Sequence, residues 1–244
     1  MRIEIVALSN MPEVRPGDDL GALIREAAKK DHQSIDGSVV LAVAQKVVSK
    51  VEGAVADLRK IQPSALAESW GKEWGKDPRL IELILSQSTR IVKMDRGILI
   101  AETRLGHICA NAGVDQSNVE DDDLATVLPP DPNASAARLR KEVGCGAVII
   151  TDTFGRPWRE GLVDVAIGVA GLDALEDYRG SCDRRGRKLT GTIVAVADQL
   201  AAAAGILMRK AAGCPVVLLR GFDWKPAEGT ARPLVRDRER DLFR

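Results

Sequence analysis

The sequence predicts an α+β fold with mixed sheets and flanking helices, and three observations lead to this prediction. Short apolar, β-branched runs alternate irregularly with amphipathic stretches, and several of the predicted strands follow one another directly. Hydrophobic residues make up 45% of the 244 residues, which allows a large buried core without disulfides. No linker-like segment divides the chain, so we expect a single domain over residues 1–244, with a loosely ordered tail from about residue 225.

The N-terminal half begins with a predicted strand and a capped helix. Asp18 or Asp19 is placed to cap that helix, because an apolar stripe at helical spacing starts at Leu20. Further strands are predicted from β-branched runs, and a break between Gly75 and Pro78 divides the next helical stretch. The predicted strands are residues 2–8, 38–44, 90–94, 97–102 and a stretch through Ile108, and the helical stretch is 63–87.

The C-terminal half continues the same pattern. Its longest amphipathic stretch, residues 192–210, predicts a helix whose stripe begins at Ile193. Residues 111–133 and 178–191 are polar and predict long loops, which in a compact domain are usually functional or disordered. The remaining predicted elements are a helix at 135–143 and strands at 146–151, 163–169 and 215–219.

Composition excludes several classes of protein. The 35 basic and 35 acidic residues cancel, and aromatic residues are only 3%, so neither nucleic acid nor a membrane surface is an expected partner. The two histidines argue against a Ser-His-Asp triad, and the four widely spaced cysteines argue against a zinc knuckle or disulfide scaffold. The N-terminal segment is too short and too charged for a signal peptide, so we expect a cytoplasmic protein.

Polar groups follow three of the predicted buried strands, where loops commonly carry function. After the strand 146–151 come Asp152 and Thr153, whose carboxylate and hydroxyl oxygens suit Mg²⁺ or Mn²⁺. The alternative is that Asp152 only caps a turn. In the loop 111–118, Asp115 could add a second carboxylate to the same metal and Asn118 could bind a base, sugar or phosphate; the alternative is a plain Asx-turn loop.

The third polar group follows the strand 38–44 and consists of Gln45, Lys46 and Lys50. Lysines at this place suit phosphate oxygens, and the alternative is that they are solvated surface lysines. The chain has neither the glycine-rich phosphate loop nor the dinucleotide fingerprint, so a bound triphosphate would have to be held by metal and lysines. The residues alone therefore lead to a metal- and phosphate-binding site whose reaction stays open.

Longer motifs at these same segments resemble the coenzyme F420:L-glutamate ligase family. The combination of NAG-x-D-x-SN and ITDT-x-GR at this separation is specific, and the resemblance extends to about Gly221. The matching stretches are MPEV (11–14), PGDDL (16–20), VSKVEG (48–53), NAGVDQSNVE (111–120), LPPDP (128–132), GAVIITDTFGRPWREG (146–161) and DVAIGVAGL (164–172).

The resemblance implies an activity and a fold. Family members join L-glutamate to a deazaflavin precursor of coenzyme F420 by γ-linked amide bonds, with GTP as co-substrate and Mg²⁺ or Mn²⁺, sometimes with K⁺. Their family-specific α+β ligase fold forms an intertwined homodimer. The implied GTP-site residues are Met11, Pro12, Glu13, Val14, Gln45, Lys46, Lys50 and Asn118. Asp115 and Asp152 would bind one metal and Thr153 would reach a second, and Asp115, Asp152 and Lys50 would be catalytic.

The chain departs from the family pattern at two places. Gln199 stands where an acidic residue is common, and Met208-Arg209-Lys210 stands where relatives often have Met-Gly followed by a charged residue. Two other functions stay open from the sequence. One is a sister ligase that glutamylates another carboxylate acceptor, and the other is a nucleotide-binding module without turnover.

Overall fold

The computed structural model of the chain describes residues 2–117, 121–209 and 213–241. Its centre is a six-stranded mixed sheet with the strand order β1-β12-β2-β8-β9-β13. Neighbouring strands run antiparallel except for β2 and β8, which are parallel. The bounds are β1 Glu4–Ala7, β2 Val40–Ala44, β8 Ala147–Arg156, β9 Arg159–Leu172, β12 Val216–Arg220 and β13 Pro226–Ala227.

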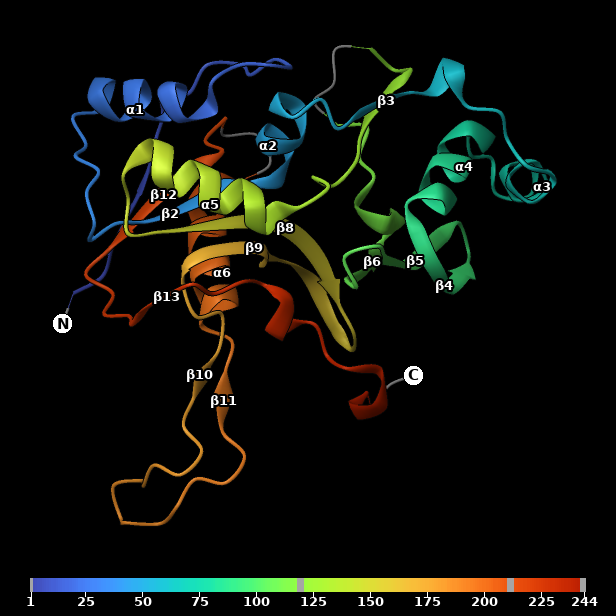
Figure 1. Cartoon of the computed structure of the whole chain (residues 1–244). Coiled ribbons are helices and arrows are strands. Elements are labelled where there is room, and N and C mark those ends of the chain that lie inside the picture. The colour runs from blue at the N-terminus through green and yellow to red at the C-terminus, as the bar shows by residue number, and fades with distance from the viewer. Residues whose placement is uncertain (1, 118–120, 210–212, 242–244) are drawn as a thin grey trace.

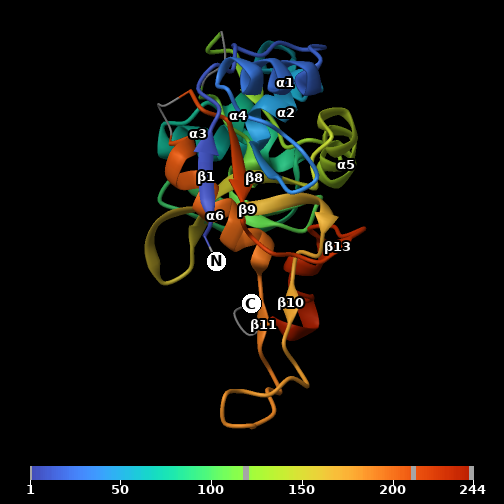
Figure 2. The same ribbon diagram turned by 90° about the vertical axis from the view of Figure 1, so that its left-hand side faces the viewer.

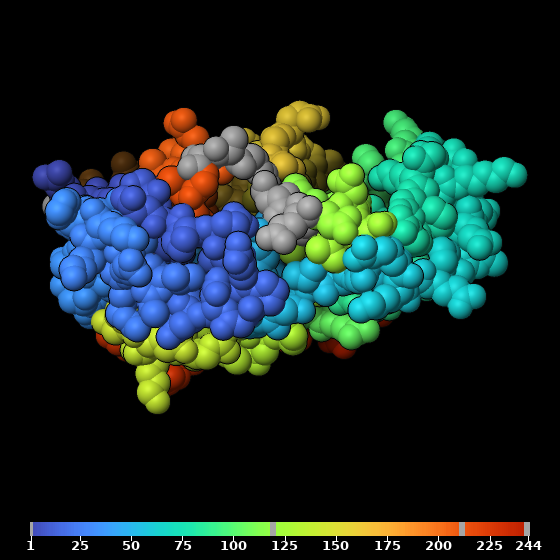
Figure 3. Space-filling model, turned by 90° about the horizontal axis from the view of Figure 1, so that it is seen from above, coloured from blue at the N-terminus to red at the C-terminus, as the bar shows by residue number. Residues whose placement is uncertain are grey.

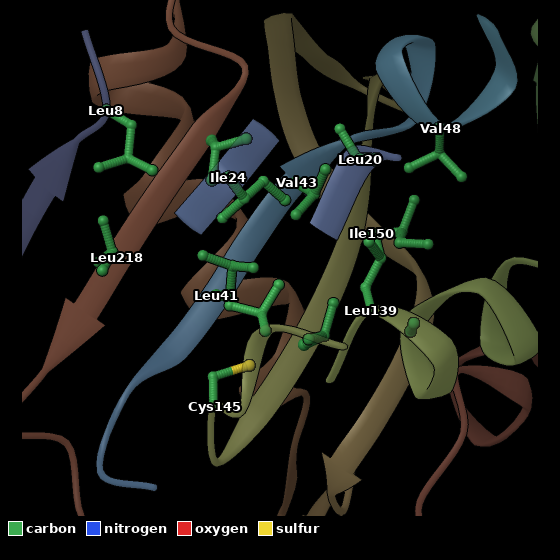
Figure 4. Packing of buried hydrophobic residues seen from close by; sticks show 14 of the residues in the cluster. Leu8, Leu20, Ile24, Leu41, Val43, Val48, Leu139, Cys145, Ile150 and Leu218 are labelled. Atoms are coloured by element: carbon green, nitrogen blue, oxygen red, sulfur yellow. The ribbon is translucent and has the colours of Figure 1, made fainter. Parts of the chain in front are cut away.

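Helices cover both faces of this sheet (Figure 1). One face carries α1 (Leu20–Lys30) and α5 (Pro132–Val143), and the other carries α6 (Val196–Met208). The apolar residues of β2, β8 and β12 divide between the two faces because successive side chains of a strand point to opposite sides. Each face thus has its own hydrophobic cluster. Figure 4 shows the first cluster, on the face covered by α1 and α5, with labelled residues from these helices and from the strands: Leu20, Ile24, Leu139, Leu41, Val43, Ile150 and Leu218.

Local sequence signals explain where these helices begin and end. Asp19 caps α1 by accepting a hydrogen bond from the Ala22 backbone nitrogen at 2.8 Å. Asp131 caps α5 in the same way, and Pro132 stands at its first position, where the missing N–H costs nothing. Gly144 ends α5 in the left-handed region, with a φ of 76°.

A lobe with its own core stands beside the sheet. It contains α3 (Ala65–Trp74), α4 (Pro78–Ser86) and a three-stranded sheet of β4 (Ser88–Asp95), β5 (Ile98–Thr103) and β6 (Ile108–Ala110). Trp70, Ile81 and Leu99 are buried in this third cluster. From above, the cyan and green segments of the lobe form one end of the molecule (Figure 3). The lobe delivers β6 and the loop after it to the central sheet.

A thin hairpin arm projects away from the body (Figures 1 and 2). It is formed by β10 (Glu176–Asp177) and β11 (Ile193–Val194) with the loop 178–192 between them. The tail after residue 225, for which the sequence shows little pattern, adds β13 to the sheet and then forms two short 3₁₀ turns, Arg232–Leu234 and Arg238–Arg240. None of the described helices has the length and apolar character that a membrane crossing requires.

The predicted α+β class is confirmed, and most predicted elements occur close to their predicted positions. Two local predictions differ from the structure, and one helix was not predicted. The loop 111–133 contains β7 (Leu124–Thr126), which pairs with the equally short β3 (Val55–Asp57). Ile193 belongs to β11 rather than to the stripe of α6, and residues 45–51 form a helix, α2 (Gln45–Val51). Elements of three residues are too short to show an alternating pattern in a sequence.

Candidate active site

A cavity of about 1030 Å³ opens where β2 ends and α2 begins. Ala44, the last residue of β2, is paired with Thr151, whereas β8 continues to Arg156 and, among the described strands, pairs there with β9 alone. The sheet therefore loses a strand at this point, and the space is bordered instead by α2, the end of α6 and the loop 11–14. Ligand sites in α/β sheets are typically found at such places, beyond the ends of parallel strands.

This arrangement corrects one sequence prediction. Asp152 and Thr153 were expected just after a strand, but they lie inside β8, because residues 152–156 pair with β9 as far as Arg159. Gly155, at which the sequence would also allow a tight turn, lies in the strand as well. The two side chains nevertheless border open space, because it is the neighbouring strand β2 that ends beside them.

The cavity brings together residues that the sequence analysis proposed from four distant segments. The predicted residues that line it are Met11, Pro12, Glu13, Val14, Gln45, Lys46, Lys50, Asp115, Asp152 and Thr153. Asn118 lies outside the described residues. Their roles toward GTP or metal stay predictions, whereas their convergence on one cavity is a property of the structure.

Asp115 is held by an ion pair and by two hydrogen bonds. Lys46 Nζ lies 2.8 Å from Asp115 Oδ2, and Ser117 donates to the same carboxylate from its backbone nitrogen at 2.7 Å and from its hydroxyl at 3.0 Å. Burial raises the pKa of Asp115, but these donors outweigh it and keep the pKa below its ordinary value. Asp115 is therefore ionised at neutral pH.

The backbone of Asp115 is fixed although it lies in a loop. Asp115 and Thr126 exchange two backbone hydrogen bonds, at 3.0 and 2.8 Å, and the Thr126 hydroxyl donates to the Asp115 carbonyl at 3.0 Å. The turn before it has Asn111, Ala112 and Gly113 at positive φ. The loop is thus a braced platform for Asp115, as expected for a functional loop on a rigid scaffold.

α2 supplies the cationic and amide groups. The Lys50 side chain is only 12% exposed and pairs with Glu13, which is 71% exposed. Gln45 is buried at the first turn of the helix, with its Oε1 2.8 Å from the Ser49 hydroxyl, which also lies 2.7 Å from the Val127 carbonyl. Lys50 and Gln45 are therefore positioned by the fold and do not behave as solvated surface residues.

A second acidic group on β9 joins the predicted pair Asp152 and Thr153. Thr153 donates from its backbone nitrogen to Asp152 Oδ1 at 2.8 Å and from its hydroxyl to Asp164 Oδ1 at 2.5 Å. Asp164 Oδ2 lies against α6 at Gly205, so closely that a Cβ added at Gly205 would be 1.9 Å from it. Asp164 lines the same cavity and was not singled out from the sequence.

The oxygen donors of the cavity fit a divalent cation. Carboxylate and hydroxyl oxygens are the ligands that Mg²⁺ and Mn²⁺ prefer. In the part of the chain that the structure describes, no three His, Cys, Asp or Glu side chains form a metal cage. Mg²⁺ at nucleotide sites is commonly held by one or two carboxylates together with substrate phosphates, so this donor set matches that kind of site.

The two departures from the family pattern fall at different distances from the cavity. Gln199 is exposed on α6 and does not line the cavity, Arg209 lines it, and Lys210 is outside the described residues. The neighbouring Asp198 has a structural contact, because it accepts a hydrogen bond from the Ala166 backbone nitrogen at 2.9 Å. Burial raises the pKa of Asp198 above its ordinary value despite this bond.

The similarity of the chain to known proteins covers the segments that form this cavity. The profile of a family described as F420-0:gamma-glutamyl ligase matches residues 9–221. Coenzyme F420:L-glutamate ligase of Methanothermobacter thermautotrophicus is 44% identical, covering 100% of both chains. The ligases of the same name from Methanopyrus kandleri and Methanocaldococcus jannaschii are 46% and 39% identical, covering 100% of this chain and 98% and 97% of theirs. The chain therefore belongs to the F420-0:gamma-glutamyl ligase family.

Proposed function

We propose that the chain is a GTP-dependent ligase that forms a γ-linked amide between L-glutamate and the carboxylate of a deazaflavin precursor of coenzyme F420. Full-length similarity to ligases of that name supports the substrates. The observation that carries the chemistry is the convergence of two lysines and three aspartates on one cavity. They are Lys46, Lys50, Asp115, Asp152 and Asp164.

The first step is phosphoryl transfer. A carboxylate oxygen of the acceptor attacks the γ-phosphorus of GTP, the bond between the γ-phosphorus and the β,γ-bridging oxygen breaks, and GDP leaves. An acyl phosphate is formed. Negative charge moves onto the leaving oxygens, so the ammonium groups of Lys46 and Lys50 are suited to stabilise the transition state. These charges act from a partly enclosed site, where screening by water is weaker.

The second step forms the amide. The amine of L-glutamate attacks the carbonyl carbon of the acyl phosphate, loses a proton, and inorganic phosphate leaves with the electrons of the broken C–O bond. Asp164, a carboxylate of the cavity that the family resemblance does not assign to the metal, is suited to accept that proton. No protein nucleophile is required, which agrees with the scarcity of histidine.

Mg²⁺ or Mn²⁺ fits the same cavity, with K⁺ as a further candidate. Asp115 and Asp152 would hold one divalent ion and Thr153 would reach a second, as the family resemblance implies. A bound divalent ion would neutralise phosphoryl oxygens and orient the triphosphate. Asp164 lies within hydrogen-bonding distance of Thr153 and adds a carboxylate to that part of the cavity.

The decisive experiment incubates the purified protein with GTP, Mn²⁺, L-glutamate and the deazaflavin precursor. We expect GDP release that depends on both glutamate and acceptor, with mass spectrometry showing the acceptor heavier by glutamate units. Glutamate-dependent GDP release with another carboxylate acceptor only would identify a sister ligase. Tight GTP binding without any product would identify a nucleotide-binding module and would contradict the proposal.

We also propose that the ligase works as a homodimer. The arm of β10 and β11 supports this, because it leaves the body of one chain and carries partly exposed apolar side chains, Tyr178 and Ile193. A hairpin that projects from its own chain and exposes apolar side chains offers a surface that a second copy could cover. Light scattering after size-exclusion chromatography should give twice the chain mass, and a monomer at micromolar concentration would contradict it.

A further inference from the structure

A second cavity, of about 450 Å³, lies between the turn after β5 and the C-terminal tail. It shares no lining residue with the active-site cavity. Two of its walls come from opposite parts of the sequence, the turn 104–107 and the segment 231–238, and Asn133 of α5 and Ile167 of β9 also line it. Small-ligand sites commonly have volumes of roughly 300–1,000 Å³.

The cavity is rich in arginine. Its lining includes four arginines, Arg104, Arg232, Arg236 and Arg238, and two acidic residues, Glu102 and Asp237. Glu102 is already neutralised, because its Oε2 accepts hydrogen bonds from Arg90 Nε at 3.1 Å and Arg90 Nη2 at 3.0 Å. Among the described residues, the lining therefore has more positively than negatively charged side chains.

The hydrogen-bonding groups are unequally satisfied. Asn133 Oδ1 accepts from the backbone nitrogens of Val169 at 3.1 Å and Ala231 at 2.8 Å, which leaves the amide N–H groups as free donors among the described residues. Within that same part of the chain, Arg232 and Arg238 form no ion pair with a carboxylate. The cavity wall thus offers N–H donors from Asn133, Arg232 and Arg238, while the Asn133 oxygen is already engaged. Available donors beside an engaged acceptor suit an anion.

The walls are held in place by contacts that do not involve these donors. Gly106 has a φ of +87°, and a Cβ there would lie 3.1 Å from Val235 Cγ1 and 3.9 Å from Arg232 Nη1, so the turn and the tail touch closely. Arg104 Nη2 donates to the Ser86 carbonyl at 2.8 Å, and the bond from Ala231 to Asn133 fixes the start of the tail. The arginines are therefore presented by a packed structure.

We propose that this cavity is a second ligand site, which takes a compact anion with carboxylate or phosphate groups. The planar guanidinium group matches both anions with paired hydrogen bonds, and Asn133 adds a neutral donor on the cavity wall. The proposal is independent of the ligase reaction, because it uses none of the residues of the active-site cavity.

His107 provides a reporter for the test. It lines the second cavity, forms a hydrogen bond with the backbone of Ile167 and lies near the charge of Arg232. The chain has only one other histidine, His32, which is exposed and lines neither cavity. The protein therefore gives two sets of imidazole NMR signals, which a His32→Gln variant assigns. The His32 signals serve as the internal reference.

The experiment titrates the full chain with inorganic phosphate in one arm and with γ-L-glutamyl-L-glutamate in the other, at constant ionic strength. We expect at least one of these anions to shift the His107 signals in a saturable way while His32 stays constant. In Arg232→Gln/Arg238→Gln the affinity should fall by at least about tenfold, because charge-assisted hydrogen bonds are lost. Both arginines are exposed, so the variant should fold, which circular dichroism checks.

Arg184→Gln/Arg185→Gln is the matched control, because it removes the same charge from exposed arginines of the arm. This control should bind with the affinity of the unmodified chain. The anion that produces the saturable shift identifies the ligand class as phosphate or carboxylate. Absence of a saturable His107 shift with both anions, or equal affinity in the two double variants, would overturn the proposal.

Discussion

Lys46 Nζ lies 2.8 Å from Asp115 Oδ2 and 2.6 Å from Ser117 Oγ, so one ammonium group joins the start of α2 to the loop after β6. The pair is partly buried, with Lys46 21% and Asp115 38% exposed. A triphosphate bound in the cavity, as proposed, would compete with Asp115 for this ammonium group. The geometry thus couples the two predicted functions of the cavity, phosphate binding by lysine and cation binding by aspartate.

Asp152→Asn tests the carboxylate on β8. We expect turnover to fall by at least ~10²-fold, because the amide is a poorer ligand for the proposed cation, which would stabilise transition-state charge. The fold should persist, since the side chain keeps its shape and its contact with the Thr153 nitrogen. Steady-state kinetics with Asp173→Asn as the exposed control would measure this. Near-normal turnover would remove Asp152 from the reacting groups.

Lys50→Met tests the lysine of α2 while it keeps most of the apolar stem. The KM for GTP should rise by about tenfold or more, because a charge-assisted contact to phosphate is lost. Lys141→Met, which changes an exposed lysine of α5, serves as the control. An unchanged KM would limit Lys50 to its pairing with Glu13.

Much of the fold follows from local signals in the sequence. The cap at Asp19, the stripe that begins at Leu20 and the β-branched runs of β2 and β8 each predict an element that the structure contains. The missed elements are those without a local signal. β3 and β7 are three residues each, and they pair with each other across a long stretch of chain.

The candidate site was predictable where a polar residue follows a predicted strand or loop signal, as for Lys46 and Asp115. Asp164 has no such signal, because it lies within an apolar run that reads as a buried strand. Its place in the site depends on Thr153 across the hairpin and on Gly205 of α6, which are contacts of the folded chain. A polar residue that interrupts an apolar strand was the available hint.

Asp115→Asn should make the acid dependence of stability weaker. A carboxyl group whose folded pKa is lowered adds to the free energy of unfolding above its unfolded pKa, and this is lost as pH falls through the folded value. The variant should therefore be less stable than the unmodified chain at about pH 7, with the difference shrinking toward about pH 3. Urea unfolding at both pH values measures it, and a difference independent of pH would show that the pKa of Asp115 is not lowered.

Asp198→Asn should show the opposite dependence. Burial raises the folded pKa of Asp198, so its ionisation lowers the free energy of unfolding as pH rises through the ordinary range of a carboxyl group. Asparagine keeps an oxygen for the hydrogen bond from Ala166 and has no charge to bury. Relative to the unmodified chain, the variant should gain stability between about pH 3 and pH 7. A relative loss over that range would mean that the carboxylate is stabilised by its surroundings.

Gly205→Ala separates helix stability from the position of Asp164. Alanine favours a helix over glycine by about 1 kcal/mol, so α6 alone would be stabilised. The added Cβ would lie 1.9 Å from Asp164 Oδ2, which forces the carboxylate and its partner Thr153 to move. We therefore expect turnover to fall by about tenfold or more in a folded protein, since displacement of reacting groups by about 1 Å has effects of that order or larger.

Gly191→Ala on the arm is the control, because a Cβ there meets nothing within 4 Å. Thermal unfolding and steady-state kinetics are measured on both variants. Full activity in a folded Gly205→Ala protein would mean that the contact between Asp164 and Thr153 has no part in the reaction. Recovery of activity when Asp164→Ala is added would instead show that the carboxylate obstructs the site once displaced, and not that its loss causes the defect.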